Sequence, residues 1–379
     1  MRRFLSGFLV ILLLIPCLAF GEGVDPVDMN VPAYCLLLPG HPEPLLERQG
    51  EKELPAAGLR KLPALVTLCR AFDNGVIAES ASMQVSSRAA KITGPTAFLE
   101  SGEQIAAGEL LKAAVMISAG DAIVALGENA FGSESVFLNN IQVTLRELGI
   151  DKELNDCLGT GTGFSPRELC ALAVAAMDSP HFCAWCGQYM DRIIHTGGRE
   201  TELVNANRLI RSYNGCFGLL TGSQKEEGYC GIFAVRRGEA CYVASIMGAK
   251  TSEDRFSAAA TLFDYAFAAY APVRLSKEGE ILAADWPVIY GDRETVDLVA
   301  HEDVSLLLNK DQGKVERRLE LPEVLTAPLF AEEKVGSAVF VLGGEEVRSI
   351  PLYPAVDVVS NTFRDIFCRI AWRYLRKNQ

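Results

Sequence analysis

The feature that most constrains the fold of this chain is a change in its hydrophobic pattern near residue 271. Before that point, apolar residues recur at helical spacing in several stretches, with strand-like runs between them. After it, short apolar runs alternate with charged and glycine-containing turns, and helical periodicity almost disappears. The 379 residues are also enough for a large domain followed by a smaller one. We therefore predict two architectures in series, over 22–271 and 272–353.

The first part is predicted to be an α/β mixture of the α+β kind, in which helices surround an antiparallel sheet. The run 62–72 reads as a buried helix with Pro63 in its first turn, and 109–128 as two helices that meet at Ser118-Ala119-Gly120. A strand is expected at 33–38 and alternating strands and turns at 216–248, and the remaining helices are expected at 135–149, 166–178, 187–194 and 256–270.

The second part is predicted to be a small all-β, sandwich-like domain. Its strands are expected in six apolar or alternating runs, VRLSK, VDLVA, VSLLL, RRLEL, SAVFVL and EVRSIPLY.

The N-terminus has the composition of a secretory signal peptide, which we place at residues 1–21. Arg2 and Arg3 precede an apolar stretch, and Ala19-Phe20-Gly21 ends it with small residues. A retained N-terminal membrane anchor is the alternative. We accordingly expect an exported protein, in the periplasm or at the outer face of the bacterial cytoplasmic membrane.

The C-terminal stretch 354–379 is predicted to be an amphipathic helix that associates with a membrane surface. Basic and aromatic side chains suit anionic lipid in an otherwise acidic chain. A helix folded back on its own domain is the alternative. The predicted membrane-binding residues are Phe363, Phe367, Arg369, Ile370, Trp372, Arg373, Arg376 and Lys377.

Composition argues against several function classes. The formal net charge of −12 and the pI near 5.0 disfavour general nucleic-acid binding. Cys183-Ala-Trp-Cys186 has redox or metal spacing, and His181 and His195 could complete a zinc site with it. Without a second such pair, buried thiols or a local disulfide are the favoured interpretation. We predict neither a metal nor a cofactor.

Three short segments occur in an order that indicates a relationship to a known family. PALVTL at 63–68 begins a buried helix, SAGDA at 118–122 lies at a break between helices, and LTG at 220–222 ends a strand. With the N-terminal stretch, the β-rich second part and the amphipathic tail, this order resembles the D-alanyl-D-alanine carboxypeptidases. These low-molecular-mass penicillin-binding proteins trim peptidoglycan stem peptides. The resemblance covers nearly the whole chain after residue 21 and implies their transpeptidase fold.

The chemistry of that family depends on the motifs S-x-x-K, S-x-N and K-T-G. A serine hydroxyl needs a nearby base to become a nucleophile, and the first lysine is placed for that role. By resemblance, Leu65 stands in the place of the nucleophile and Leu68 in that of the base. The second motif keeps Ser118 but has Gly120 in place of asparagine.

The third motif keeps Thr221 and Gly222, but Leu220 replaces the lysine that supplies charge near the substrate carboxylate. No S-x-x-K occurs anywhere in the chain. His195-Thr196-Gly197 resembles the third motif, but it lies before the segment that the motif should follow, so a turn is favoured. Ser118, Thr221 and Arg255 remain as candidate ligand contacts, with simple turn chemistry as the alternative for the first two.

These losses predict a catalytically inactive protein that binds peptidoglycan stem peptides or cell-wall enzymes. An active D,D-carboxypeptidase with unrecognised catalytic residues is one alternative. An exported structural protein with no ligand in the cleft is another.

Overall fold

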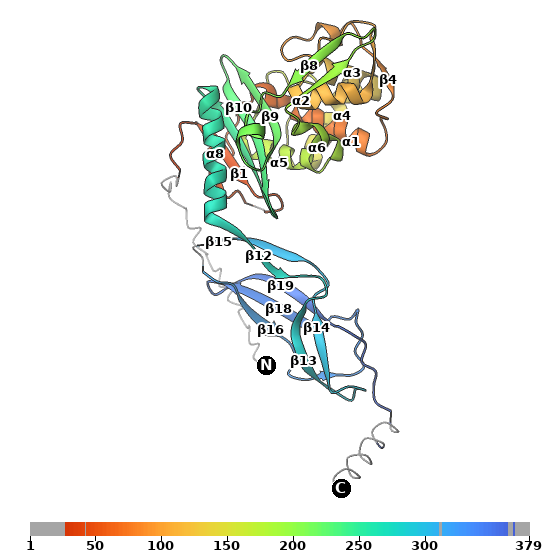
Figure 1. The fold of residues 1–379 in the computed structure, drawn as a ribbon, viewed down its shortest axis with the longest axis vertical. Coiled ribbons are helices and arrows are strands. Elements are labelled where there is room, and N and C mark those ends of the chain that lie inside the picture. The colour runs from red at the N-terminus through yellow and green to blue at the C-terminus, as the bar shows by residue number, and fades with distance from the viewer. Residues whose placement is uncertain (1–26, 42, 311–312, 363–366, 368–379) are drawn as a thin grey trace, which may run out of the picture.

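The computed structural model describes residues 27–41, 43–310, 313–362 and 367, so the predicted signal peptide lies outside it. The chain forms a helix-and-sheet body and a separate β body, which are joined where α8 (Ser252–Ala269) runs directly into β12 (Tyr270–Ser276) (Figure 1). The predicted boundary between 271 and 272 falls inside β12.

The first body is built around a five-stranded sheet in the order β2-β1-β11-β10-β9, with every neighbouring pair antiparallel. This order makes β9 an edge strand. Its register sets Leu220 opposite Ile232 and Thr221 opposite Gly231. The strands are β1 (Ala33–Leu37), β2 (Leu46–Arg48), β9 (Cys216–Gln224), β10 (Gly228–Arg237) and β11 (Ala240–Ala249).

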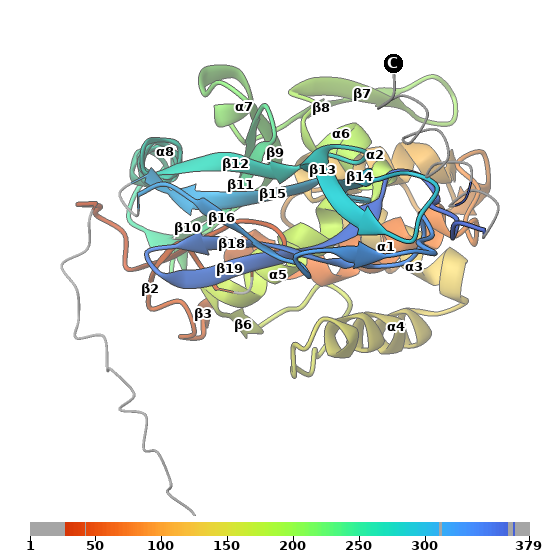
Figure 2. The ribbon, with the colours of Figure 1, turned by 90° about the horizontal axis from the view of Figure 1, so that it is seen from below.

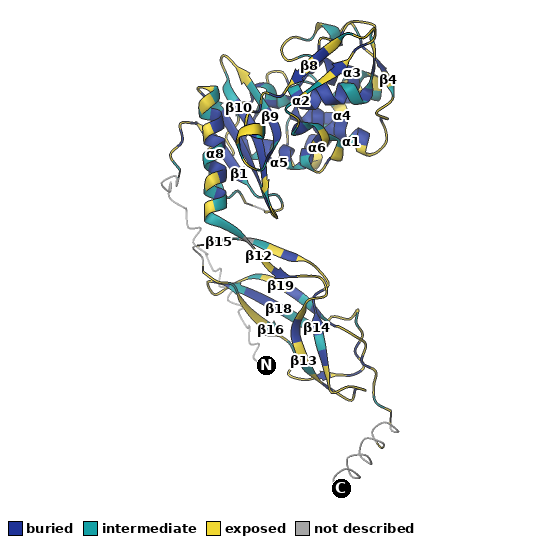
Figure 3. Cartoon of the chain, viewed as in Figure 1, coloured by how far each residue is buried: buried dark blue, intermediate teal, exposed yellow. Residues whose placement is uncertain are grey.

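Helices cover both faces of this sheet and extend beyond it. One core lies between the sheet and α8, and a larger one joins the opposite face to α5 and the other helices (Figure 3). The helices besides α8 are α1 (Leu62–Asp73), α2 (Ala107–Ile117), α3 (Gly120–Phe131), α4 (Glu134–Glu147), α5 (Pro166–Met177), α6 (Pro180–Cys186) and α7 (Leu209–Ser212), with 3₁₀ turns η1 (Ala57–Lys61) and η2 (Ala89–Lys91).

Local sequence explains where several of these helices begin. Ser165 and Glu168 form a capping box at the start of α5, with Pro166 at the first helical position. Thr251 caps α8 by accepting a hydrogen bond from the Asp254 N–H. The predicted break within 109–128 is confirmed, because Ser118 ends α2 in the left-handed region at φ 53°.

One predicted helix is wrong. Residues 187–194 contain β7 (Met190–Ile194), which pairs with β8 (Glu200–Val204) in a hairpin. Burial alternates along β8, as a strand with one covered face requires. His195 to Gly198 form the connecting turn, in which both glycines have positive φ. Two further short pairs join β3 (Leu54–Pro55) to β6 (Gly163–Phe164) and β4 (Ser82–Gln84) to β5 (Gln104–Ala106).

The second body contains a six-stranded sheet, β16-β18-β19-β14-β13-β17, and the pair β12-β15 (Figures 1 and 2). All six predicted runs form strands. The strand at Ile281–Ile289 was missed, because bulges interrupt its register and Asp285 has a positive φ. The strands besides β12 are β13 (Ile281–Ile289), β14 (Thr295–Val299), β15 (Val304–Asn309), β16 (Glu316–Glu320), β17 (Leu325–Thr326), β18 (Gly336–Leu342) and β19 (Glu345–Pro354).

The predicted start of the C-terminal helix at 354 is also wrong. Residues 356–362 are not helical, and fully buried Val358 exchanges two backbone hydrogen bonds with Leu329 in the β body. Packing against this core therefore overrides the helical pattern. Phe367 is 62% exposed. The other predicted membrane-binding residues lie outside the described residues, namely Phe363, Arg369, Ile370, Trp372, Arg373, Arg376 and Lys377.

Within the described ranges, no single helix has the length and apolar composition needed to cross a membrane. The pair α5 and α6 meets that criterion only jointly, and its two members are bent by 104°.

Candidate functional site

A cleft of about 710 Å³ lies beside the β9 edge of the sheet, where the strand faces η1 and the end of α2. It brings together four residues predicted from sequence, Ser118, Thr221, Gly222 and Arg255, and one of the replacing leucines, Leu220. The wall also includes Arg60, Lys61, the loop at 93–98 and the segment 202–206.

The two leucines of α1 do not line this cleft. Leu65 and Leu68 are both 0% exposed and belong to one hydrophobic core with Leu220, which is 3% exposed. Positions three apart on a helix share a face, so α1 points both side chains into that core. The predicted placement of the nucleophile and base at 65 and 68 is therefore wrong, because neither side chain faces the cleft. Gly58 and Lys61, which have the spacing of S-x-x-K, line it instead.

The glycine of the third motif is explained by the packing of β9 against η1. A Cβ atom at Gly222 would lie 2.4 Å from the Gly58 nitrogen and 2.8 Å from its Cα. Only glycine allows the backbones of β9 and η1 to approach this closely. Gly222 is therefore required by the fold, whether or not the cleft performs chemistry.

The second motif lies at the junction of α2 and α3. Ser118 is 5% exposed, and the adjoining helix begins at Gly120. A Cβ atom at position 120 would lie 2.8 Å from Ile92 Cγ2 and 3.3 Å from Lys61 Nζ. The space that an asparagine side chain would need is thus already occupied by these two neighbours.

Lys61 is a cleft residue that the sequence reasoning missed. Its ammonium donates a hydrogen bond of 2.8 Å to the Ser118 carbonyl oxygen, and the residue is 8% exposed. Burial lowers the pKa of Lys61 to about 8, with Arg60 acting in the same direction and the Asp121 carboxylate opposing both. The available signal was its spacing, because Lys61 follows Gly58 as the lysine of S-x-x-K follows the serine. The fold shows the pair in place, with Gly58 against Gly222 of the third motif.

Arg255 lines the cleft and also supports the strands beneath it. One of its terminal nitrogens donates to the Gly222 oxygen at 3.2 Å and to the Cys230 oxygen at 3.0 Å. Its guanidinium lies over the Phe256 ring, and Nε is buried with no protein partner. Burial lowers the pKa of Arg255 to about 10. The residue is thus 5% exposed and already engaged with β9 and β10.

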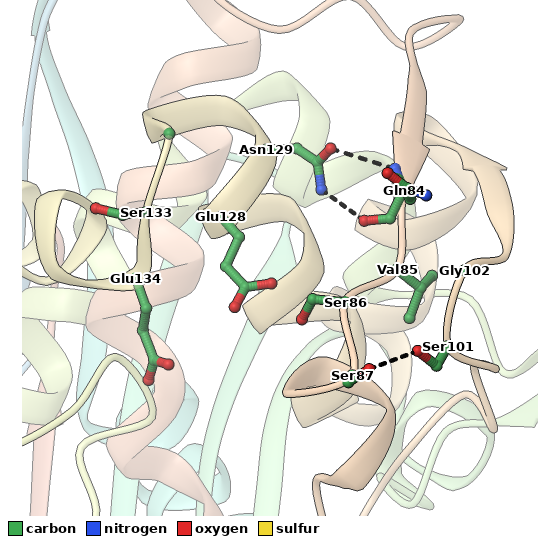
Figure 4. A pocket seen from close by; sticks show the side chains of 11 residues that line it. Gln84, Val85, Ser86, Ser87, Ser101, Gly102, Glu128, Asn129, Ser133 and Glu134 are labelled. Carbon is green, nitrogen blue, oxygen red and sulfur yellow. Dashed lines mark hydrogen bonds between the residues drawn. The ribbon is translucent and has the colours of Figure 1, made fainter.

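A second pocket, of about 600 Å³, lies away from these motifs, beside β4 and the α3–α4 junction (Figure 4). Ser86 accepts a hydrogen bond from the Ala89 N–H, and Ser87 pairs with Ser101 at 2.8 Å. Asn129 bridges the Gln84 backbone. These serines close turns, and among the described residues their hydrogen bonds join them to the backbone or to each other.

The two histidines that could have completed a zinc site with Cys183 and Cys186 have other partners. His181 contacts Asp73 at 2.5 Å and Glu79 at 3.3 Å, while His195 contacts Glu103 at 2.7 Å and Thr201 at 2.8 Å. The ring nitrogens of both histidines are thereby engaged elsewhere. Among the described residues, no group of three or more His, Cys, Asp or Glu side chains could hold a metal ion.

Comparison with known proteins now identifies the family. A model of the D-alanyl-D-alanine carboxypeptidases matches residues 43–251, which is more than half of the chain. The chain belongs to the D-alanyl-D-alanine carboxypeptidase family. A second model, of the penicillin-binding protein 5 C-terminal domain, matches residues 270–360. Members of this family act in the peptidoglycan metabolism of the cell wall.

Relatives align over most of their length. The D-alanyl-D-alanine carboxypeptidase DacF of Bacillus subtilis is 27% identical, over 83% of this chain and 82% of its own. DacC of Escherichia coli is 25% identical, over 96% and 93%. The structure of penicillin-binding protein 5 from Haemophilus influenzae superposes with a TM-score of 0.72 at 21% identity, covering 89% of this chain and all of that one. The predicted family and fold class are confirmed.

Proposed function

We propose that this member of the D-alanyl-D-alanine carboxypeptidase family has lost catalysis and acts as a binding protein for peptidoglycan stem peptides. The observation that carries the proposal is Gly58, which lines the cleft against Gly222 at the place that S-x-x-K spacing to Lys61 gives to the serine. In serine enzymes, losing the nucleophile alone abolishes most of the rate enhancement. Here Lys61 keeps an amine in the cleft, but Gly58 has no hydroxyl that could attack a substrate.

The cleft itself remains suited to a peptide. Its volume of about 710 Å³ lies within the usual range for ligand sites. β9 is an edge strand, and an extended peptide can pair with the edge of a sheet. The lining of the cleft contains three cationic residues, Arg60, Lys61 and Arg255, and one carboxylate, Glu202. The net positive charge of this lining favours a ligand that ends in a carboxylate.

We further infer that the protein is exported and acts at the outer face of the bacterial cytoplasmic membrane. The N-terminal composition and the basic, aromatic C-terminal stretch support this location. The same stretch would bring the cleft near newly made peptidoglycan, where a cell-wall enzyme is a second candidate partner.

Fluorescent penicillin tests the loss of catalysis. The full chain is incubated with the label, beside an active family member as positive control and a heat-denatured sample as background. We expect no covalent label above background. Acylation of any serine in the native protein, mapped by peptide mass spectrometry, would overturn the inactive assignment.

Calorimetric titration with a stem pentapeptide tests binding. Thr221→Val removes one hydroxyl from the cleft, and Thr295→Val, at the exposed first residue of β14 in the β body, is the matched control. We expect saturable binding, weakened by about 5–10-fold in Thr221→Val, since one hydrogen bond contributes roughly 1 kcal/mol. No heat at millimolar peptide, or equal weakening in both variants, would refute the binding role.

A further inference from the structure

The pair Cys183 and Cys186 at the end of α6 is not explained by the proposed function. The nine cysteines of the described residues are free thiols, and these two differ sharply in exposure. Cys183 is exposed, while Cys186 is buried beneath β9. A Cβ atom at Gly218 would lie 3.1 Å from the Cys186 sulfur, so the sulfur touches the strand that carries Thr221.

The two thiols are placed to react with each other. They stand three residues apart in one helix, and the Cys186 thiol reaches back to the Cys183 carbonyl oxygen at 3.9 Å. Such residues have Cβ atoms roughly 5–6 Å apart, whereas a disulfide draws them to about 3.8 Å. The helix ends at Cys186, with Gly187 as its C-cap, so the last turn can tighten without disturbing a longer helix. A bond formed by such tightening is easier to reduce than an unstrained one.

The surroundings make the two thiols unequal. The neighbouring Cys186 thiol lowers the pKa of Cys183 to about 7, and the Arg236 guanidinium adds to this effect. Partial burial and the carboxylates of Asp178 and Asp73 oppose it. The pKa of Cys186 is raised by the same thiol pairing and by its burial. An exposed thiolate beside a buried protonated thiol is the arrangement of an attacking and a resolving cysteine.

We propose that Cys183 and Cys186 form a thiol–disulfide exchange pair that reacts with exposed organic disulfides. The Cys183 thiolate attacks one sulfur of the disulfide, forms a mixed disulfide and releases the first thiol. Cys186, on losing its proton, attacks the Cys183 sulfur, closes the internal bridge and releases the second thiol. Two electrons pass from the cysteines to the disulfide, and the two thiol protons end on the released thiols.

Oxidised glutathione is the probe for this exchange, with the full-length protein and its Cys186→Ser and Cys183→Ser variants. Free thiols are alkylated after each interval, and the products are mapped by mass spectrometry. The wild type is expected to acquire a Cys183–Cys186 bridge and no lasting glutathione. Cys186→Ser should keep glutathione bound to Cys183 as a mixed disulfide. Cys183→Ser should form neither the internal bridge nor a mixed disulfide with glutathione.

Cys241 provides a matched control, because it also lies beside Arg236 but burial raises its pKa. At pH 7, iodoacetamide should alkylate Cys183 at least about tenfold faster than Cys241, since the thiolate is the reactive form. Circular dichroism verifies that each variant is folded. Three outcomes would each overturn the proposal. Cys183 could stay free throughout the glutathione series, it could form a bridge to another cysteine, or it could react with iodoacetamide no faster than Cys241.

Discussion

Leu68 shows what the apolar positions of α1 contribute. Its side chain is 0% exposed in the core shared with Leu65 and Leu220. Replacing it by lysine would put an ammonium into this hydrophobic core. A buried charge without a partner is strongly disfavoured.

We predict that Leu68→Lys lowers the free energy of unfolding by at least about 3 kcal/mol. Leu65→Ser should cost roughly 2–5 kcal/mol, because it leaves a cavity and buries a hydroxyl. Val143→Lys, on the exposed face of α4, is the control and should change little. Urea denaturation measures all three, and a small effect of Leu68→Lys would show that this side chain reaches solvent.

Lys61 predicts a pH dependence of stability. Its pKa is about 8 in the folded protein, below the ordinary value of 10.5, so between these limits the unfolded chain binds more protons. Stability therefore rises with pH across this window, by an amount on the order of 3 kcal/mol. Below pH 8 the charged, buried ammonium lowers stability.

In Lys61→Met this rise should be absent. Urea denaturation of the wild type and the variant from pH 7 to 10.5 gives the comparison, with exposed Lys91→Met as control. The difference between wild type and Lys61→Met should grow in favour of the wild type as pH increases. Parallel curves would mean that the Lys61 amine is solvated in the folded state.

At the scale of elements, the contact between η1 and β9 holds the cleft wall in place. The backbones of Gly58 and Gly222 meet without side chains between them. Gly222→Ala should therefore separate the two elements, with a loss of about 1–3 kcal/mol in stability and of stem-peptide binding.

Ser223→Ala, one residue further along β9, is the matched control and should stay within about 0.5 kcal/mol of the wild type. Thermal denaturation and the peptide titration provide the two readouts. Gly222→Ala with unchanged stability would indicate that η1 can move away from the strand at no cost.

The sequence pattern correctly predicted those helices and breaks that are determined by residues close together in the sequence. The helix α1 follows from apolar spacing and an early proline, and the α2–α3 break follows from Ser118 to Gly120. The region 187–194 was mistaken for helix, because its pairing with β8 depends on a partner strand. β13 was missed for the same kind of reason, since its bulges follow from its neighbour β14.

The cleft was predicted in part. The order of three motifs located Ser118, Thr221 and Leu220, which the fold does bring together. The first motif was misplaced at 65–68 instead of 58–61, because the contact that identifies Lys61, from its amine to the Ser118 carbonyl, spans 57 positions of sequence. Such a contact is determined by how η1 packs against the α2–α3 junction.

At the scale of the whole molecule, the two bodies have separate hydrophobic cores. Their connection has no linker, since α8 ends at Ala269 and β12 begins at Tyr270. The Lys310 ammonium donates to the carbonyl oxygens of Phe267 at 3.0 Å and Ala268 at 2.8 Å. A residue after β15 thus satisfies the last turn of α8, where carbonyls otherwise lack partners.

Lys310→Ala should loosen this junction. We expect the Tyr270 amide, which donates to the Ala266 oxygen, to exchange its hydrogen roughly fivefold faster, corresponding to about 1 kcal/mol. Hydrogen exchange followed by mass spectrometry measures it, with exposed Lys277→Ala as control. Unchanged exchange would show that strand pairing alone fixes the end of α8.

The packing around Gly120 also has a consequence for any attempt to rebuild the three family motifs. A side chain at 120 meets Ile92 Cγ2 and Lys61 Nζ, and a side chain at 58 meets the Gly222 backbone. Because these neighbours are in contact, the effects of substitutions there do not add independently. A serine at 58, an asparagine at 120 and a lysine at 220 must therefore be introduced together as well as singly, since the single variants do not predict the combined one.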